Sequence, residues 1–399
     1  MVTSVVLTVN ETLTPSSLQA RIDKIPIGLV HMTCVGICGV SMFFHAASFQ
    51  LPQFSVMPLL VGIGLCCLAT HWTGKRPLVI TGLVVSGLLC YLGSLSQYSG
   101  IYLSLALIGC GLGLPASVAL TMETFPSKFR GLGVSILMCF WIAGEFYLTA
   151  TDHLIAQSNN ALRLELLAIP VFVGGLAALA FLNESPMSLQ DDCYALNSLL
   201  ARMDPSGGSQ IRFSPQAAVC RNEAGEKKNF INTLVLGIMV GLSQSFLINR
   251  FSTVASVSVF SLLVEFIAVL VVGGSVALHN PRIASITFSF LLTTVAVIKW
   301  FPIVEPLIRA AAVCLAVFCL VCGARDVNLV LLFSQLTTCL VTMTLEQAGN
   351  DDFRLLILSI VFGLAGLVAA LTLREDNVET SDSSSFGFKK IPIIKYGSL

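Results

Sequence analysis

The chain has 399 residues, of which 55% are hydrophobic and 11% charged, and its formal net charge is zero. Soluble domains carry roughly a quarter charged residues, so this composition excludes a soluble globular protein and indicates a polytopic membrane protein. The zero net charge gives no reason to expect nucleic acid as a partner.

Apolar segments of membrane-spanning length follow one another along the chain. A bilayer core of about 30 Å needs about 20 residues of helix for each crossing. The tenth and eleventh segments below can also be read as one longer helix that is broken at Arg325 and Asp326. The pattern predicts an all-α polytopic membrane protein with twelve transmembrane helices, at residues 26–47, 54–72, 77–95, 101–122, 132–150, 162–182, 230–248, 254–278, 283–301, 306–323, 327–345 and 353–373.

These segments divide the chain into five parts. An N-terminal tail (1–25) precedes a six-helix half (26–182), and a polar central loop (183–229) leads to a second six-helix half (230–373) and a C-terminal tail (374–399). The loop includes an amphipathic stretch, Leu196–Met203, which predicts one short helix on the membrane surface.

Lysine and arginine are distributed unevenly between the two faces of this topology. Seventeen of the 22 lie on the face that holds both tails and the central loop, so the positive-inside rule makes that face cytoplasmic. We expect a multi-pass protein of the plasma membrane or of an intracellular vesicle membrane. The remaining five are assigned to the opposite face: Arg163, Arg250, Lys299, Arg309 and Arg354.

Three short polar motifs lie on the cytoplasmic face. They are His71-Trp-Thr-Gly-Lys-Arg-Pro77 after the second span, Glu123-Thr-Phe-Pro-Ser-Lys-Phe-Arg-Gly131 after the fourth, and Asn183-Glu-Ser-Pro186 after the sixth. Basic and acidic residues in neighbouring loops can form charge-assisted hydrogen bonds. The motifs therefore predict a network of charges on this face.

These motifs and the six-plus-six layout resemble the major facilitator superfamily, and within it the organic cation and anion transporters of solute carrier family 22 and their synaptic-vesicle-two-related cousins. The resemblance implies two halves that bind a small organic solute between them, with an organic ion among the options, and that expose it by alternating access. It also implies that the cytoplasmic charges gate this movement: Lys75, Arg76, Glu123, Arg130 and Glu184.

Two carboxylates fall inside predicted spans. Glu145 ends the run Phe140-Trp-Ile-Ala-Gly-Glu145, and Glu265 follows an apolar run as it does in the relatives. An ionisable group inside a membrane indicates a functional site, although a buried acid that hydrogen-bonds to another helix is an open alternative. The candidates for a substrate or proton site are Glu145, Glu265, His31, His45 and Trp141.

Catalytic motifs are absent from the sequence. It has no phosphate-binding loop, no two Cys-x-x-Cys motifs that could pair as a metal site and no His-Glu-x-x-His helix, and its five histidines are not spaced for metal binding. We therefore expect no enzyme activity, no cofactor and no metal site. The expected partners are a small-molecule substrate and membrane lipids, with a coupling proton or ion left open.

Several departures from the family pattern support an alternative function. His71 replaces the acid of the first loop motif, its second copy is reduced to His279-Asn-Pro-Arg282, and Leu332-Phe-Ser-Gln-Leu-Thr-Thr338 replaces the second acidic signature. The fourth span also lacks the arginine that is frequent in the relatives. The alternative is a transporter-derived membrane protein that no longer transports and acts as a binding or trafficking partner.

Overall fold

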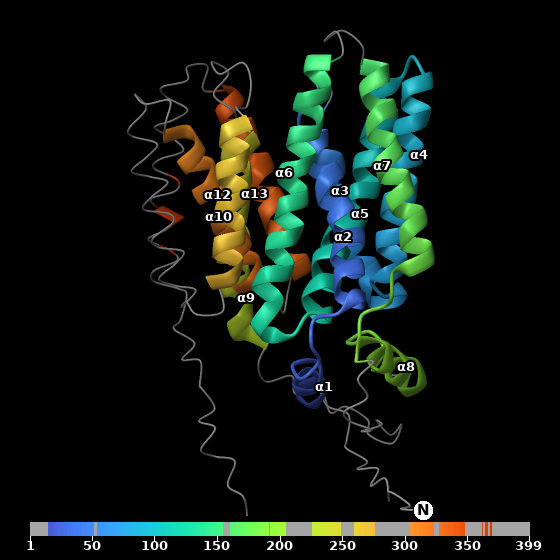
Figure 1. Cartoon of the computed structure of the whole chain (residues 1–399). Coiled ribbons are helices and arrows are strands. Elements are labelled where there is room, and N and C mark those ends of the chain that lie inside the picture. Colours follow the sequence, from blue (N-terminus) through green and yellow to red (C-terminus); the bar gives the residue numbers. More distant parts are fainter. Residues whose placement is uncertain are drawn as a thin grey trace, which may run out of the picture.

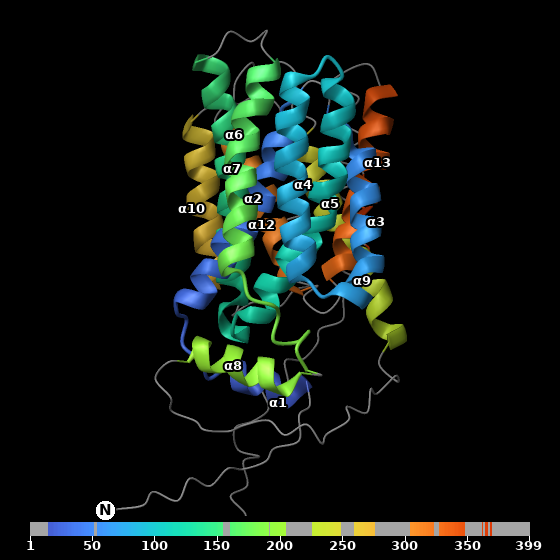
Figure 2. The same ribbon diagram turned by 90° about the vertical axis from the view of Figure 1, so that its right-hand side faces the viewer.

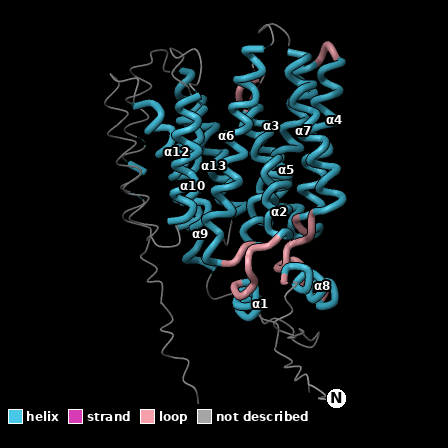
Figure 3. Tube along the Cα trace, in the orientation of Figure 1, coloured by secondary structure: helices cyan, strands magenta, loops and turns pink. Residues whose placement is uncertain are grey.

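The structure is a computed structural model. It describes residues 15–51, 54–154, 160–190, 192–204, 226–248, 259–275, 304–322 and 327–347, together with four positions between 361 and 368. The described residues form helices and connecting loops without any strand (Figure 3).

The first set of membrane-length helices lies where the first six apolar segments predict it. The ends of each helix lie within a few residues of the ends of the predicted span, because the length of the apolar run and the charges beside it determine where the helix begins and ends. Five of these helices are long and apolar enough to cross a membrane, and α3 is slightly shorter in its apolar part. The first set consists of α2 (Leu29–Ser48), α3 (Val56–Thr73), α4 (Arg76–Leu95), α5 (Ser99–Thr124), α6 (Arg130–Leu154) and α7 (Asn160–Phe181).

The second set has four described helices, which coincide with the seventh, eighth, tenth and eleventh predicted spans. The ninth predicted span and nearly all of the twelfth lie outside the described residues. Arg325 and Asp326 also lie outside them. The helices of the second set are α9 (Glu226–Ile248), α10 (Val259–Ser275), α12 (Val304–Cys322) and α13 (Val327–Gln347).

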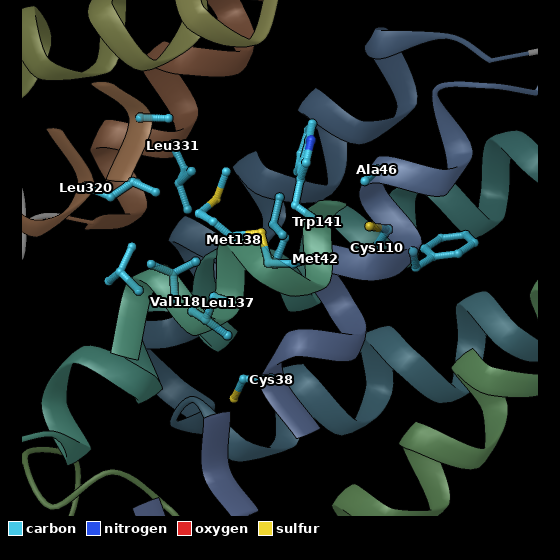
Figure 4. Packing of buried hydrophobic residues seen from close by; sticks show 14 of the residues in the cluster. Cys38, Met42, Ala46, Cys110, Val118, Leu137, Met138, Trp141, Leu320 and Leu331 are labelled. Atoms are coloured by element: carbon cyan, nitrogen blue, oxygen red, sulfur yellow. The ribbon is translucent and has the colours of Figure 1, made fainter. Parts of the chain in front are cut away.

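The two sets lie side by side with their helices roughly parallel (Figures 1 and 2). Helix α6 contacts α10 and α12, and α3 contacts α13, so these helices form the seam between the sets. One apolar core extends across the seam. Figure 4 draws Met138 and Trp141 of α6 together with Leu320 of α12 and Leu331 of α13, all buried members of this core.

Close helix approach in the first set depends on small residues. A Cβ atom at Gly62 of α3 would meet the carbonyl oxygen of Ile108 and lie 2.9 Å from the Cα of Gly111, both in α5. Glycine allows the two backbones to touch, as is common where membrane helices pack. The outer faces remain apolar, with exposed Val173, Leu176 and Leu179 on α7, as expected for a surface in contact with lipid.

Two short helices form a separate unit below one end of the bundle (Figures 1 and 2), which we call the α1/α8 end. They are α1 (Pro15–Ile22) and α8 (Cys193–Met203), the second of which contains the predicted amphipathic stretch. Asp192 caps α8 by accepting the N–H groups of Tyr194 and Ala195. The unit has its own apolar core, made of Leu18, Ile22, Ile25, Leu196, Leu199, Leu200 and Met203.

Candidate functional site

The first component of the site is on α6. Glu145 and Trp141 are four residues apart, so they lie on the same face of this helix. Both are buried, and the Trp141 indole N–H donates to Oε1 of Glu145 at 3.1 Å. The hydrogen bond fixes the carboxylate, because the tryptophan ring itself is held in the apolar core.

Arg309 of α12 brings the two predicted carboxylates together. Its Nη2 group is ion-paired with Oε2 of Glu145, and its Nε group is ion-paired with Oε1 of Glu265 on α10. Only 5% of Glu145, 0% of Glu265 and 4% of Arg309 is exposed. We call Glu145, Arg309 and Glu265 the charge triad. It joins one helix of the first set to two helices of the second.

The charge triad carries a formal charge of −1 when all three groups are ionised. A buried charge without a partner is costly in any apolar interior, and most of all in a membrane, where water is far away. Arginine compensates one carboxylate charge and shares its donors with both. The arrangement is therefore suited to take up one further positive charge, either a proton or a bound cation.

His45 of α2 lies next to the triad through Trp141. The imidazole packs edge-on against the indole, with 4.9 Å between ring centroids, and also contacts Phe49 at 4.7 Å. It is fully buried, and neither ring nitrogen has a hydrogen-bond partner among the described residues. An imidazole in this position retains one donor and one acceptor for a ligand or a proton.

His31 is separated from this site, although it is in the same helix. It precedes His45 by 14 residues, which corresponds to about 21 Å along an α-helix. Its Nδ1 atom accepts the Gly28 N–H at 3.1 Å, and its ring packs edge-on against Phe125. The structure therefore places Glu145, Glu265, Trp141 and His45 together and His31 elsewhere.

The predicted charge network lies at the α1/α8 end. Lys75 Nζ is 2.8 Å from Oε2 of Glu123, and this same oxygen accepts the hydroxyl of Ser185. Lys75 is at the beginning of α4 and Glu123 at the end of α5. The ion pair thus connects two loops of the first set and leaves both side chains partly exposed.

Glu184 binds the beginning of α4 through backbone groups. Its Oε1 accepts the N–H of Lys75 at 3.1 Å and its Oε2 accepts the N–H of Arg76 at 3.1 Å. Helix N-termini carry unpaired N–H groups that attract negative charge. The preceding Gly74 has a φ of 73°, and a Cβ atom there would lie 2.8 Å from Glu184 Oε2, so the turn requires glycine.

The two arginines of the predicted network bind other groups. Arg76 donates from Nη2 to the carbonyl oxygen of Leu179 at 3.2 Å. Arg130 donates to the carbonyl oxygen of Met122 at 2.9 Å and to the amide oxygen of Gln19 in α1. Arg130 therefore connects the loop before α6 to the α1/α8 unit.

Replacing Glu184 by alanine is expected to loosen the turn before α4. The loss of a capping carboxylate costs about 0.5–2 kcal/mol, so the amides of Lys75 and Arg76 should exchange with solvent several times faster. Hydrogen exchange of the purified protein measures this directly. Glu165→Ala removes an exposed acid of α7 and serves as the control. Unchanged exchange in Glu184→Ala would show that the carboxylate does not hold this turn.

Comparisons with known proteins add evidence on the fold. No protein-family model and no curated protein matches the sequence. Among solved structures, the proton:xylose symporter XylE bound to 6-bromo-6-deoxy-D-glucose aligns with a TM-score of 0.61 at 15% identity, over 90% of this chain and 95% of its own. The fucose:proton symporter FucP of E. coli aligns with a TM-score of 0.50 at 12% identity. This alignment covers 86% of this chain and 98% of the FucP chain.

The chain has the major facilitator fold. In this fold two six-helix halves pack around a site near the membrane midplane. The first and second sets of helices correspond to these halves. The α6, α10 and α12 helices coincide with the fifth, eighth and tenth predicted spans, and the charge triad lies between the first and second sets of helices.

Sequence reasoning missed Arg309 as a site residue. The predicted topology counted it among the charges of the non-cytoplasmic face, and the structure shows it buried inside α12 between two acids. It is close to the start of its apolar segment, where charge counting treats an arginine as part of a loop. A signal was available, since ionisable residues inside spans commonly pair with one another.

Metal ligands do not gather in the described part of the chain. Among these residues no group of three or more His, Cys, Asp or Glu side chains is placed to hold an ion.

Proposed function

We propose that this protein carries a small organic solute across a membrane by alternating access, with the charge triad as its central binding or proton site. The observation that carries the proposal is the ion pair between Arg309 of one half and Glu145 of the other. A buried ionic contact between two packed halves is costly to maintain in a membrane and is a default indication of function.

The triad offers a simple way to couple binding to movement. Glu265 and Arg309 belong to the same half, so their ion pair can persist when the halves separate. Glu145 belongs to the other half and would lose its cation. A proton or a cationic group of the solute could then neutralise Glu145, with Trp141 and His45 beside it. This makes an organic cation or a proton the preferred occupant.

In the described part of the chain, the polar contacts between the halves near the α1/α8 end are long and uncharged. There Asn328 of α13 donates to the hydroxyl of Thr70 at 3.4 Å, and the Cys67 thiol lies 3.6 Å from the Asn328 carbonyl oxygen. Such long neutral contacts are worth less than the charged ones. We infer that this end opens first. By the distribution of Lys and Arg it is the cytoplasmic end, where the predicted gating charges also lie.

Uptake into vesicles that contain the purified protein tests this function. A panel of organic cations, anions and zwitterions is measured with and without a proton gradient. Saturable uptake supports a carrier. If a correctly inserted, monodisperse protein takes up nothing across the panel, the alternative of a transporter-derived binding or trafficking protein is favoured.

Replacing Glu145 by glutamine is expected to preserve the fold and impair transport. Glutamine can keep the hydrogen bonds to Trp141 and Arg309, but it makes the triad neutral and removes the group that takes up positive charge. We expect uptake to fall at least about tenfold, or to lose its dependence on the proton gradient. Glu165→Gln is the control. Uptake like that of the parent at every pH would refute the assigned role of Glu145.

A further inference from the structure

A second buried polar group lies between α9 and α13, both in the second half. Gln335 donates from Nε2 to Oε1 of Gln244 at 2.6 Å, and the Thr338 hydroxyl lies 3.5 Å from the same oxygen. Gln335 and Thr338 are fully buried and Gln244 nearly so. We call Gln244, Gln335 and Thr338 the amide cluster. Two of its members belong to the stretch that replaces the second acidic signature of the family.

The hydroxyl groups around the cluster already donate to backbone carbonyl oxygens, and the Thr338 hydroxyl also lies 3.1 Å from the carbonyl oxygen of Gly241 in α9. Ser334 donates to the carbonyl oxygen of Leu331 at 2.9 Å, Thr338 to that of Ser334 at 2.8 Å, and Ser245 to that of Gly241 at 2.8 Å. Hydroxyls that bond back to the preceding turn are not available to a ligand. The hydrogen-bonding capacity of the site therefore depends on its amides.

One amide oxygen of the cluster is left over. Gln335 Oε1 is buried and has no hydrogen-bond partner among the described residues. Two glutamines that served only to join α9 and α13 could pair reciprocally and satisfy both oxygens. This pair forms a single bond and leaves an acceptor inside the membrane, where unpaired polar groups are especially costly.

The position of Gln335 in α13 places this residue on the side of the seam between the halves. Asn328 and Cys339 of the same helix contact Thr70 and Met57 of α3 in the other half. Gln335 follows Asn328 by seven residues and precedes Cys339 by four. At 3.6 residues per turn all three lie on one face of α13. Gln335 therefore lies on the face of α13 that packs against the first half.

We propose that the amide cluster is a neutral subsite that accepts a hydrogen bond from a hydroxyl or N–H group of the transported solute. The proposal rests on the transport function above and specifies its substrate class. Gln335 binds a hydrogen-bond donor of the solute. The expected substrate is therefore a small organic solute that bears a hydroxyl or N–H group.

Matched probe pairs test the subsite. Choline is compared with propyltrimethylammonium, and ethanolamine with propylamine, because each pair differs by a methyl group in place of the hydroxyl. Binding is followed by thermal stabilisation of the purified protein, and uptake is followed in vesicles. We expect the parent to bind the hydroxylated member of at least one pair about tenfold more tightly, because a site that hydrogen-bonds a hydroxyl discriminates against its methyl analogue.

Three variants assign the discrimination to Gln335. Gln335→Met keeps the side-chain length and should reduce the preference below about threefold, without changing affinity for the methyl analogue. Gln244→Met removes the group that holds Gln335 and should weaken the preference as well, which provides a second test if Gln335→Met is not monodisperse. Ser334→Ala removes a buried hydroxyl that is satisfied within its own helix, and it should keep the full preference.

The outcomes separate this proposal from the proposed function. A parent that takes up a probe but treats both members of each pair alike refutes the subsite and leaves transport standing. Selective binding without uptake refutes transport and leaves the subsite standing. Loss of the preference in Ser334→Ala to the same degree as in Gln335→Met, or no binding of any probe, overturns the proposal.

Discussion

Arg309→Met will be the most damaging single substitution in the described part of the second half. It removes the only cation of the charge triad and leaves Glu145 and Glu265 buried without their ion-pair partner. Removing one member of a buried ion pair costs about 3–5 kcal/mol. We expect a clearly lower midpoint of thermal unfolding in detergent, a smaller monodisperse fraction and no measurable uptake.

A compensated variant separates stability from function at this site. When Glu145 and Glu265 are also replaced by glutamine, no charge remains in the triad, and most of the lost stability should return because neutral replacements of whole ionic groups are often tolerated. Transport should not return. Arg202→Met, which removes an exposed arginine of α8, is the control. An Arg309→Met protein as stable as the compensated variant would contradict the proposed energetic role of Arg309.

Gly62→Ala will strongly destabilise the first half, although it adds one methyl group. The new Cβ atom would meet the Ile108 carbonyl oxygen and the Cα of Gly111, and neither is the end of a flexible side chain that can move away. Overpacking of this kind costs about 1–3 kcal/mol and sometimes more. The expected result is a lower midpoint of thermal unfolding with reduced yield of folded protein.

The same helix supplies a matched control. A Cβ atom at Gly64, two residues further on in α3, meets nothing within 4 Å. Gly64→Ala should therefore leave stability unchanged or raise it slightly, since alanine has the higher helix propensity. Equal destabilisation by the two substitutions would indicate that helix propensity or lipid exposure, and not the contact of α3 with α5, determines the effect.

The helices could be predicted from the sequence because their causes are local. Apolar runs of spanning length, with charged interruptions such as that from Glu123 to Arg130, determine where α5 ends and α6 begins. The amphipathic stretch in the central loop likewise predicted α8. The major facilitator fold followed from motifs and layout together, and it is confirmed by the alignment with XylE.

The site could be predicted only in part, because its geometry depends on which helices are neighbours. Glu145 and Glu265 were identifiable individually as acids in apolar surroundings. That they share Arg309 depends on the packing of α6 against α10 and α12, which no local pattern encodes. The same limitation applies to His31 and His45, which looked equivalent in sequence and lie at different depths of α2.

The amide cluster shows a further limit of pattern reasoning. Gln335 and Thr338 lie where the second acidic signature of the family was expected. In the sequence alone they indicate only that this signature is missing. In the structure they form a buried polar group with Gln244, a residue about 90 positions earlier. Uncharged polar side chains are common in apolar segments, so their importance emerges only when their partners are known.

The small core shared by α1 and α8 has a consequence for the biogenesis of the protein. Leu18 and Ile22 emerge from the ribosome early, but the residues that cover them, Leu196 to Met203, are made only after all six helices of the first half. Asp23 also accepts hydrogen bonds from the backbone and side chain of Ser127, which is synthesised in between. The apolar partners of α1 are thus complete only when Met203 has been made, and a first half produced as a separate fragment needs to extend to Met203 to bury Leu18 and Ile22.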